Sequence, residues 1–287
     1  MASILLVGNG PNYFSTSVSW ADVVRATAKA ARLQNHVEQL LNEPLPLVYE
    51  RIASQYPNHE RKARLALASR LIDMKPNTIH AELMALNWAN VLTTNYDSCL
   101  EGATGRDFRP ANLEGETTYS VYRRKSSQGQ FIWNIHGHAG GPRTMLLGIH
   151  GYAGYLQKLR RYLTSKLDGS PFVYGSQSDL ESGRHSWADL FLRDDVHVVG
   201  LGLGYAEIDL WWLIGYKQRL KYVKGLKVGR SVYYQIGRIS TEMRGRLELL
   251  QGMGVTIKHI DPANSLPTPS SWSLLVKQLK NVGGSAR

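Results

Sequence analysis

Side chains able to do chemistry follow two buried strands that the sequence predicts. The segment VLTTNYD, residues 91–97, turns from an apolar run into Asn95 and Asp97, and the segment FIWNIHG, residues 131–137, ends with His136 beside a glycine. An amide and a carboxylate can hold a polar ligand, and an imidazole exchanges a proton near neutral pH. Each residue also has an ordinary structural explanation, because Asp97 can cap a helix and His136 can be a hydrogen-bonded histidine at a strand end.

Glycines gather at comparable positions after two other predicted strands. Gly8, Asn9 and Gly10 follow the first strand, and Gly202 and Gly204 follow a later one. Glycine lets backbone N–H groups approach an anion closely, which suits a pyrophosphate. Such turns are also common without a ligand, and the first loop lacks the third glycine of the dehydrogenase pattern GxGxxG. This departure argues against hydride transfer.

Three histidines, His136, His138 and His150, lie close together in the sequence. They do not predict a metal site, because zinc needs convergent ligands and no matching set of cysteines or acidic residues accompanies them. His138 and His150 therefore compete with His136 for a catalytic role. Further along, Glu207 also follows a predicted strand, whereas the run DLWWLI, residues 209–214, is more typical of the buried face of a helix than of an aromatic binding platform.

Apolar runs predict the strands that would bring these residues together. The predicted strands are Ser3–Val7, Asn90–Thr94, Phe131–Ile135, Val196–Leu201, Val232–Ile236 and Val255–Ile260. Amphipathic helices are predicted at Tyr155–Leu167, Ala206–Lys221, Thr241–Met253 and Ser271–Leu279. Near-continuous apolar strands alternating with helices are typical of a parallel sheet covered on both faces. We therefore predict an α/β fold, a Rossmann-like, doubly wound and mostly parallel sheet whose carboxyl edge carries the ligand site.

The remaining segments predict how the sheet is elaborated. Trp20–Trp88 is expected to be mostly helical and broken by prolines, which indicates a helical insertion or cap, and Ser19 with Asp22 forms a capping-box pattern at its start. Thr104–Gly129 and Gly169–His185 are predicted loops or small excursions from the sheet. We expect a single domain over residues 1–287, with the insertion at about 20–88 and a C-terminal Rossmann half at about 190–282.

Composition narrows the class of protein. With 287 residues and 43% hydrophobic composition, the chain can bury a large core. No apolar run approaches the roughly 20 residues that span a bilayer, and the N-terminus lacks the basic flank of a secretion signal, so a cytoplasmic location without membrane contact is expected. The single cysteine, Cys99, leaves no partner for an internal disulfide and no set of thiolates for a structural zinc.

The formal net charge of +11 raises nucleic-acid binding as an alternative, because lysine and arginine release counterions from phosphate backbones. The basic residues are dispersed, however, and no recognisable nucleic-acid-binding motif accompanies them. A solvated basic surface, a polyanionic small ligand or an acidic protein partner explains the charge better.

Taken in chain order, four motifs resemble the sirtuin-like family. They are VGNGPN at 7–12 with the following Ser19-Trp20, LTTNYD at 92–97, NIHG at 134–137 and VVGLGLGYAEIDLWWLI at 198–214. Within that family the chain resembles the bacterial NAD hydrolases (NADases) of antiphage defence, of the type that partners a HerA-type ATPase. The resemblance implies a Rossmann-type domain that binds NAD+ and breaks its bond between nicotinamide and ribose.

The resemblance also implies roles for the residues at the motif positions. Asn95 would orient the ribose or the attacking water, and His136 would act as general base toward a ribose hydroxyl or water. Asp97 would contact the nicotinamide carboxamide. The other implied NAD-binding residues are Gly8, Asn9 and Gly10 at the phosphates, Gly202 and Gly204 at the adenosine ribose, and Asn12 and Thr94.

One departure from the family decides the expected reaction. Deacylating sirtuins carry a zinc module built on four cysteines, and one cysteine cannot build it. We therefore expect hydrolysis of NAD+ as the substrate, with water as the nucleophile and no metal, depleting NAD+ in antiphage defence by abortive infection.

The expected partners are further copies of the chain and a separately encoded activating protein, either a HerA-type ATPase or a nucleotide-sensing subunit. The leading alternative is a non-catalytic NAD- or nucleotide-binding regulatory subunit of a defence complex. A nucleic-acid-associated protein and a peptide deacylase rank below it.

Overall fold

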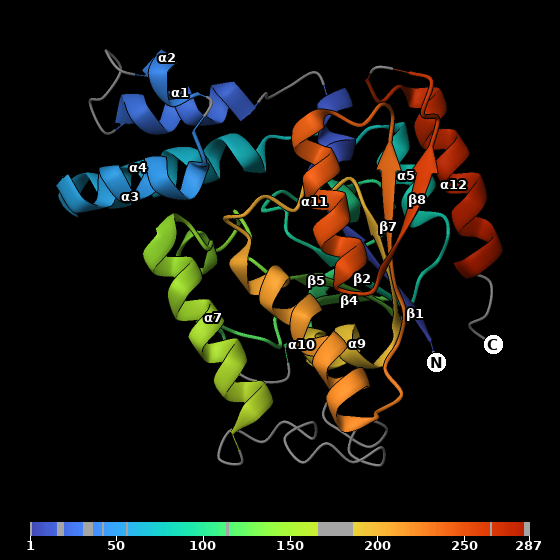
Figure 1. The fold of residues 1–287 in the computed structure, drawn as a ribbon. Helices are drawn as coiled ribbons and strands as arrows, with labels where there is room; N and C mark the ends of the chain where they lie inside the picture. The colour runs from blue at the N-terminus through green and yellow to red at the C-terminus, as the bar shows by residue number, and fades with distance from the viewer. Residues whose placement is uncertain are drawn as a thin grey trace.

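The computed structural model describes residues 2–15, 20–30, 37–41, 43–55, 57–112, 115–165, 186–264 and 266–283. These residues form one sheet of eight strands in the order β3-β4-β5-β2-β1-β6-β7-β8 (Figure 1). The strands are β1 (Ser3–Val7), β2 (Asn90–Thr93), β3 (Arg109–Pro110), β4 (Lys125–Ser127), β5 (Gln130–Asn134), β6 (Asp195–Val199), β7 (Ser231–Ile236) and β8 (Val255–Ile260). All neighbouring pairs from β5 to β8 are parallel, which confirms the predicted α/β class with a mostly parallel sheet.

The sequence did not predict the far edge of the sheet. β4 pairs antiparallel with β5, and β3 pairs antiparallel with β4. Both strands lie inside Thr104–Gly129, which was predicted as loops or small excursions from the sheet. Strands this short contain no alternation of apolar and polar residues that could reveal them.

Helices cover both faces of the sheet, because successive side chains of its inner strands point to opposite sides and both sides are buried. On one face lie α7 (Gly148–Thr164), α9 (Trp187–Arg193), α10 (Ile208–Lys224) and α11 (Thr241–Gly252), which bury Leu6 and Val198 among their own apolar side chains. On the other face lie α5 (Thr78–Met84), α6 (Cys99–Gly102) and α12 (Pro269–Gly283), which bury Leu5 and Val91. The doubly wound arrangement therefore follows from two separate apolar cores.

The predicted helical segment divides into two parts. The helices α1 (Trp20–Ala30), α2 (Val37–Leu40), α3 (Leu45–Gln55) and α4 (Pro57–Ile72) form a third apolar cluster, whereas α5 packs on the sheet. This third cluster includes Cys99 and Met145, which follow β2 and β5, so the helices pack beside the carboxyl ends of these strands. Figure 1 shows them as a layer apart from the sheet. Ser19 of the predicted capping box and the predicted loop Gly169–His185 lie outside the described residues.

Short 3-10 helices follow two of the strands. The first, η1 (Gly10–Phe14), follows β1, and η3 (Pro142–Thr144) lies between β5 and α7. In the part of the chain that the structure describes, no helix has both the length and the apolar character needed to cross a membrane.

Candidate active site

The predicted site residues come together because the strands that precede them are neighbours. β5, β2, β1 and β6 are adjacent and parallel, so the loops that leave their carboxyl ends lie at one edge of the sheet. Backbone hydrogen bonds continue past the strand ends, from Thr94 N–H to the Val7 carbonyl at 3.4 Å and from Ile135 N–H to the Thr93 carbonyl at 3.0 Å. This edge is where an open parallel sheet binds its ligands.

The first glycine loop packs tightly against the loop after β6. The Gly8 N–H donates to the Val199 carbonyl at 3.0 Å, and the Gly10 N–H donates to the Gly200 carbonyl at 2.7 Å. A Cβ on Gly8 would lie 2.5 Å from the Leu201 Cα, and one on Gly10 would lie 2.6 Å from the Gly200 Cα. The structure thus gives both glycines a packing role, and their N–H groups already have acceptors. Their contact with phosphates stays a prediction, and Asn9 between them is exposed.

The second glycine loop is open. Nothing lies within 4 Å of a Cβ built on Gly202 or on Gly204. The carbonyls of this loop are held, since Gly202 O accepts from Arg246 Nη1 at 2.7 Å and Gly204 O accepts from Trp211 Nε1 at 3.2 Å. The predicted ribose contact at these glycines is untested, but the space it requires is present beside them.

Asn95 lies buried just beyond β2, with its amide oriented by the backbone of the loop that follows β1. Its Nδ2 donates to the Gly8 carbonyl at 3.1 Å, and its backbone N–H donates to Thr93 Oγ1 at 3.1 Å. Among the described residues no donor is bonded to Asn95 Oδ1. This oxygen is the atom through which Asn95 can accept a hydrogen bond from a ligand hydroxyl or a water.

Asp97 serves the helix that follows it and still has free acceptor capacity. Its Oδ1 accepts from the Cys99 backbone N–H at 2.9 Å, at the start of α6, although the N-cap position itself is Ser98. Its Oδ2 accepts from Asn12 Nδ2 at 2.8 Å, although Asn12 lies far away in the sequence on η1. Because each carboxylate oxygen can accept about two hydrogen bonds, Asp97 can also bind a donor on a ligand.

His136 forms the most buried polar pair of this edge. Its Nε2 lies 2.8 Å from Asp209 Oδ2, and the exposed fractions of the two side chains are 1% and 0%. The rings of Tyr152 and Tyr155 meet the imidazole edge-on, with centroids at 5.3 and 6.2 Å. Burial alone would lower the pKa of His136, but the Asp209 carboxylate and then Glu207 outweigh burial, so the pKa is raised. Because its pKa is raised, the His136 imidazole can accept a proton, and the neighbouring carboxylates stabilise the imidazolium that forms.

Glu207 brings a second carboxyl group to this region. Burial raises the pKa of Glu207 to about 7, while the charge on His136 lowers it and the charge on Asp209 raises it. Glu207 immediately precedes α10, and Asp209 lies in its first turn. The two acidic residues therefore come from one segment that approaches His136 from the β6 side.

The two competing histidines have different surroundings. Burial, followed by the charges of Lys125 and Arg123, lowers the pKa of His138 to about 4. His150 is exposed on α7, where its backbone N–H donates to Glu50 Oε2 at 3.1 Å. Of the three histidines, His136 alone has a buried carboxylate partner among the described residues.

The hydrogen-bond partners of the predicted residues were not predicted from the sequence. Asp209 was interpreted as part of a buried helix face, which is correct for its burial but omits its bond to His136. Only the position of Asp209, two residues after Glu207 at the start of a helix that follows a strand, could have indicated from the sequence that Asp209 belongs to the site. His80 bonds Asn12 on the other side of the site, and no sequence pattern indicated this role.

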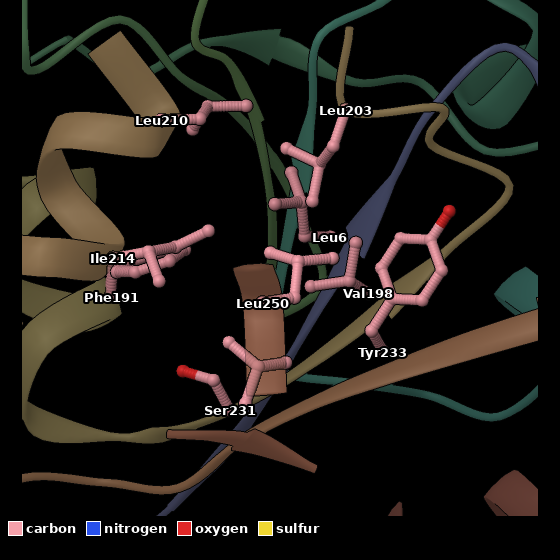
Figure 2. A pocket seen from close by; sticks show the side chains of 10 residues that line it. Leu6, Phe191, Val198, Leu203, Leu210, Ile214, Ser231, Tyr233 and Leu250 are labelled. Atoms are coloured by element: carbon pink, nitrogen blue, oxygen red, sulfur yellow. The ribbon is translucent and has the colours of Figure 1, made fainter. Parts of the chain in front are cut away.

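A small apolar cavity exists elsewhere in the fold (Figure 2). It has a volume of about 10 Å³ and lies between the sheet and the helices of one face, lined by Leu6, Phe191, Val198, Leu210 and Leu250 among others. A cavity of this size and lining is a packing void rather than a ligand site. In the described ranges no group of three or more His, Cys, Asp or Glu side chains is placed to hold a metal ion.

Comparison with known protein families relates one segment of the chain to a known domain. Residues 89–175 match the model of the SIR2-like domain, a match that includes Asn95, Asp97 and His136 and supports a sirtuin-like family. SIR2-like domains are often NAD-dependent enzymes, so an NAD-related function is compatible with the match. The two glycine loops lie outside the matched residues. No curated protein matches the chain.

Proposed function

We propose that the protein hydrolyses NAD+ at the bond between nicotinamide and ribose. The observation that carries the proposal is the buried pair of His136 and Asp209 beyond the end of β5, next to β2, the strand that Asn95 follows. A paired imidazole can take up a proton and an oriented amide can hold a water or a ribose hydroxyl, which are two tasks in such a reaction. The SIR2-like match over residues 89–175, which includes Asn95 and His136 but not Asp209, supports NAD+ as the substrate.

In the proposed reaction the C1′–N bond of the nicotinamide ribose breaks and leaves an oxocarbenium-like sugar. The oxygen of a water molecule then bonds to C1′, giving ADP-ribose, nicotinamide and one proton. Asn95 Oδ1 holds the water or a ribose hydroxyl, and His136 accepts the proton. The carboxylate of Asp209 stabilises the resulting imidazolium, and Asp97 accepts a hydrogen bond from the nicotinamide carboxamide.

Water is favoured over an acyl group as the nucleophile for a compositional reason. The four-cysteine zinc module of deacylating sirtuins cannot form in a chain with one cysteine, and Cys99 is buried in the helical cluster beside α6. Burial, followed by the charge of Asp97, raises the pKa of the Cys99 thiol, so it is a poor nucleophile itself.

The proposal is tested by following nicotinamide release from NAD+ with purified protein, alone and with candidate activating partners. We expect release that Asn95→Ala and His136→Ala each abolish, while His150→Ala, an exposed histidine on α7, retains it. Circular dichroism checks that the variants are folded. An Asn95→Ala variant with full activity contradicts the assignment.

A non-catalytic NAD-binding subunit is the second candidate, and one observation favours it. His136 is only 1% exposed, so a substrate reaches its ring only if neighbouring side chains move. Calorimetry that detects NAD+ binding without any cleavage, in the assembled complex as well as in the isolated chain, distinguishes this function from hydrolysis.

We further propose that the protein is an effector of antiphage defence that self-associates and is activated by a separately encoded partner, a HerA-type ATPase or a nucleotide-sensing subunit. The support is the sirtuin-like family together with the formal net charge of +11, which suits an acidic partner. Light scattering that finds a monomer at every concentration, fully active without a partner, contradicts this proposal.

A further inference from the structure

A fully buried histidine lies behind the residues of the candidate site. His80, on α5, has an exposed fraction of 0%, and both of its ring nitrogens have polar neighbours. Its Nε2 lies 2.9 Å from Asn12 Oδ1, and its Nδ1 lies 3.2 Å from the Asn77 backbone N–H. A buried imidazole bonded at both nitrogens is fixed in orientation, so it can fix the groups that it contacts.

The chemistry of the partners determines how the Asn12 amide is turned. One end of this amide lies 2.8 Å from Asp97 Oδ2 and 2.8 Å from Asn9 Oδ1. A carboxylate oxygen accepts but does not donate, so the end that faces Asp97 must be the NH2 group. The other end, which faces His80, is therefore the carbonyl oxygen of Asn12.

The orientation of Asn12 in turn determines the protonation of His80. Because Asn12 Oδ1 is an acceptor, His80 Nε2 must carry a hydrogen. Burial lowers the pKa of His80 although the charge of Asp97 raises it, so the neutral form is favoured, with Nδ1 accepting from the Asn77 N–H. Nδ1 also lies 2.8 Å from Asn77 Oδ1, which would accept from the imidazolium, and Nε2 carries its hydrogen in both charge states.

The chain of hydrogen bonds is anchored at both ends. Asn77 caps α5 through its Oδ1, which accepts from the Ile79 and His80 N–H groups, and its Nδ2 donates to the Pro11 carbonyl at 2.9 Å. At the other end Asp97 is bonded to the first turn of α6. The segment η1 is therefore fixed to α5, and α5 fixes the direction in which Asn12 presents its NH2 group.

We propose that His80 is a positioning residue of the NAD site, which aims the Asn12 amide at Asp97 and thereby orients the Asp97 carboxylate toward the nicotinamide carboxamide. This role rests on the proposed function, because Asp97 is taken to contact the carboxamide. His80 itself does not touch the substrate. Without the Nε2 hydrogen, the carbonyl end of the Asn12 amide loses its donor, and only the bonds of its NH2 group to Asp97 and Asn9 still orient it.

The first test measures the tautomer of His80 and does not depend on activity. Nitrogen-15 NMR of the wild-type chain is expected to show a hydrogen on Nε2 of His80, identified by the loss of its signals in His80→Gln. A neutral His80 with its hydrogen on Nδ1 overturns the proposal.

The second test compares three variants for NAD+ binding and kinetics. His80→Leu removes the donor, whereas His80→Gln places an amide N–H near the position of Nε2. His197→Leu is the matched control, a buried histidine of β6 that bonds Tyr234 on the opposite side of the sheet from Asp209. We expect His80→Leu to raise the KM and the Kd for NAD+ about tenfold or more, the scale of one lost buried hydrogen bond. His80→Gln is expected to stay within about threefold of wild type, and His197→Leu to lose stability without changing either constant.

A comparison of kcat with KM and Kd distinguishes a positioning role of His80 from a role in folding alone. A purely structural role for His80 would reduce the amount of folded protein, and so the apparent kcat, with an unchanged KM and Kd, and that result overturns the proposal. Measuring Kd by calorimetry in a His136→Ala background, on protein shown by circular dichroism to be folded, keeps the test independent of cleavage. If wild type binds but never cleaves NAD+, hydrolysis fails and the positioning role is still decided by the Kd values. If His80→Leu binds as tightly as wild type, the positioning role fails alone.

Discussion

Replacing Asp209 by asparagine tests the mechanism most directly, because it keeps the shape of the side chain and removes its charge. In the native pair, His136 Nε2 and Asp209 Oδ2 are 2.8 Å apart and almost wholly excluded from solvent. A hydrogen bond to a charged group contributes about 1.5–3 kcal/mol, whereas a neutral one contributes about 1 kcal/mol. Asp209→Asn is therefore expected to lower the free energy of unfolding by about 1–2 kcal/mol, or Tm by about 2–4 °C for a chain of this size.

The effect of Asp209→Asn on catalysis should be much larger than its effect on stability. Without the carboxylate, the imidazolium of His136 is no longer stabilised while its burial is unchanged, so kcat/KM is expected to fall by about 10²–10⁴, the usual contribution of a general base. The pKa of His136 falls as well, because burial then dominates. The acidic limb of the pH–rate profile, which reports the loss of the neutral base, should accordingly move to lower pH.

The stability difference between the two proteins should also depend on pH. In wild type the folded pKa of His136 is raised, so its stabilising contribution is complete below the unfolded value of about 6.5 and is lost as the pH rises through the folded value. In Asp209→Asn this contribution is absent, so the gap in Tm is widest at acidic pH. Asp189→Asn, which alters a buried carboxylate bonded to Tyr162, is the control that loses stability but keeps the profile. A variant Asp209→Asn with wild-type kcat/KM and an unmoved acidic limb refutes the role of this pair.

Further substitutions separate the roles of other residues. Asn95→Ala should abolish nicotinamide release while lowering the free energy of unfolding by only about 1 kcal/mol, the scale of the bond to the Gly8 carbonyl. If the amount of folded protein falls as much as the activity does, the catalytic role of Asn95 is contradicted. Gly8→Ala should destabilise by about 3 kcal/mol or more in chemical denaturation, since its Cβ meets the Leu201 backbone. Gly202→Ala should stay within about 0.5 kcal/mol of wild type and raise the KM for NAD+, and an unchanged KM argues against ribose contact there. Burial lowers the pKa of Lys217 from 10.5 to about 7, so the unfolded chain binds more protons between these values and Tm should rise with pH across them, a rise that Lys217→Met removes.

Much of the fold could be predicted from the sequence because its inner strands are apolar and bounded by turns. β1, β7 and β8 start and end within a residue of the prediction, and β2 and β6 end slightly earlier than expected. The edge strands β3 and β4 escaped detection, because Arg109–Pro110 and Lys125–Ser127 have no apolar period to recognise. The helix α9 was missed for a similar reason, since its seven residues follow a polar stretch directly and lead into β6.

The candidate site was predictable only as far as strand ends reveal it. Asn95 and His136 could be singled out because they interrupt apolar runs, and the parallel sheet places such interruptions at one edge. The partners of their side chains, the Gly8 carbonyl and the Asp209 carboxylate, come from distant segments, and no local pattern encodes such a pairing. Asp209 on α10 and His80 on α5 became visible only in three dimensions.

The bonds from Gly8 and Gly10 to the loop after β6 also bear on the order of folding. They join the first strand to residues beyond the middle of the chain, so a long loop must close before they form, and contacts of this kind are made late. On the ribosome, the segment carrying Val199, Gly200 and Asp209 emerges after the other strands of the site. The site therefore cannot be assembled in a growing chain until most of it has been synthesised, so a nascent fragment cannot possess whatever activity the finished site has.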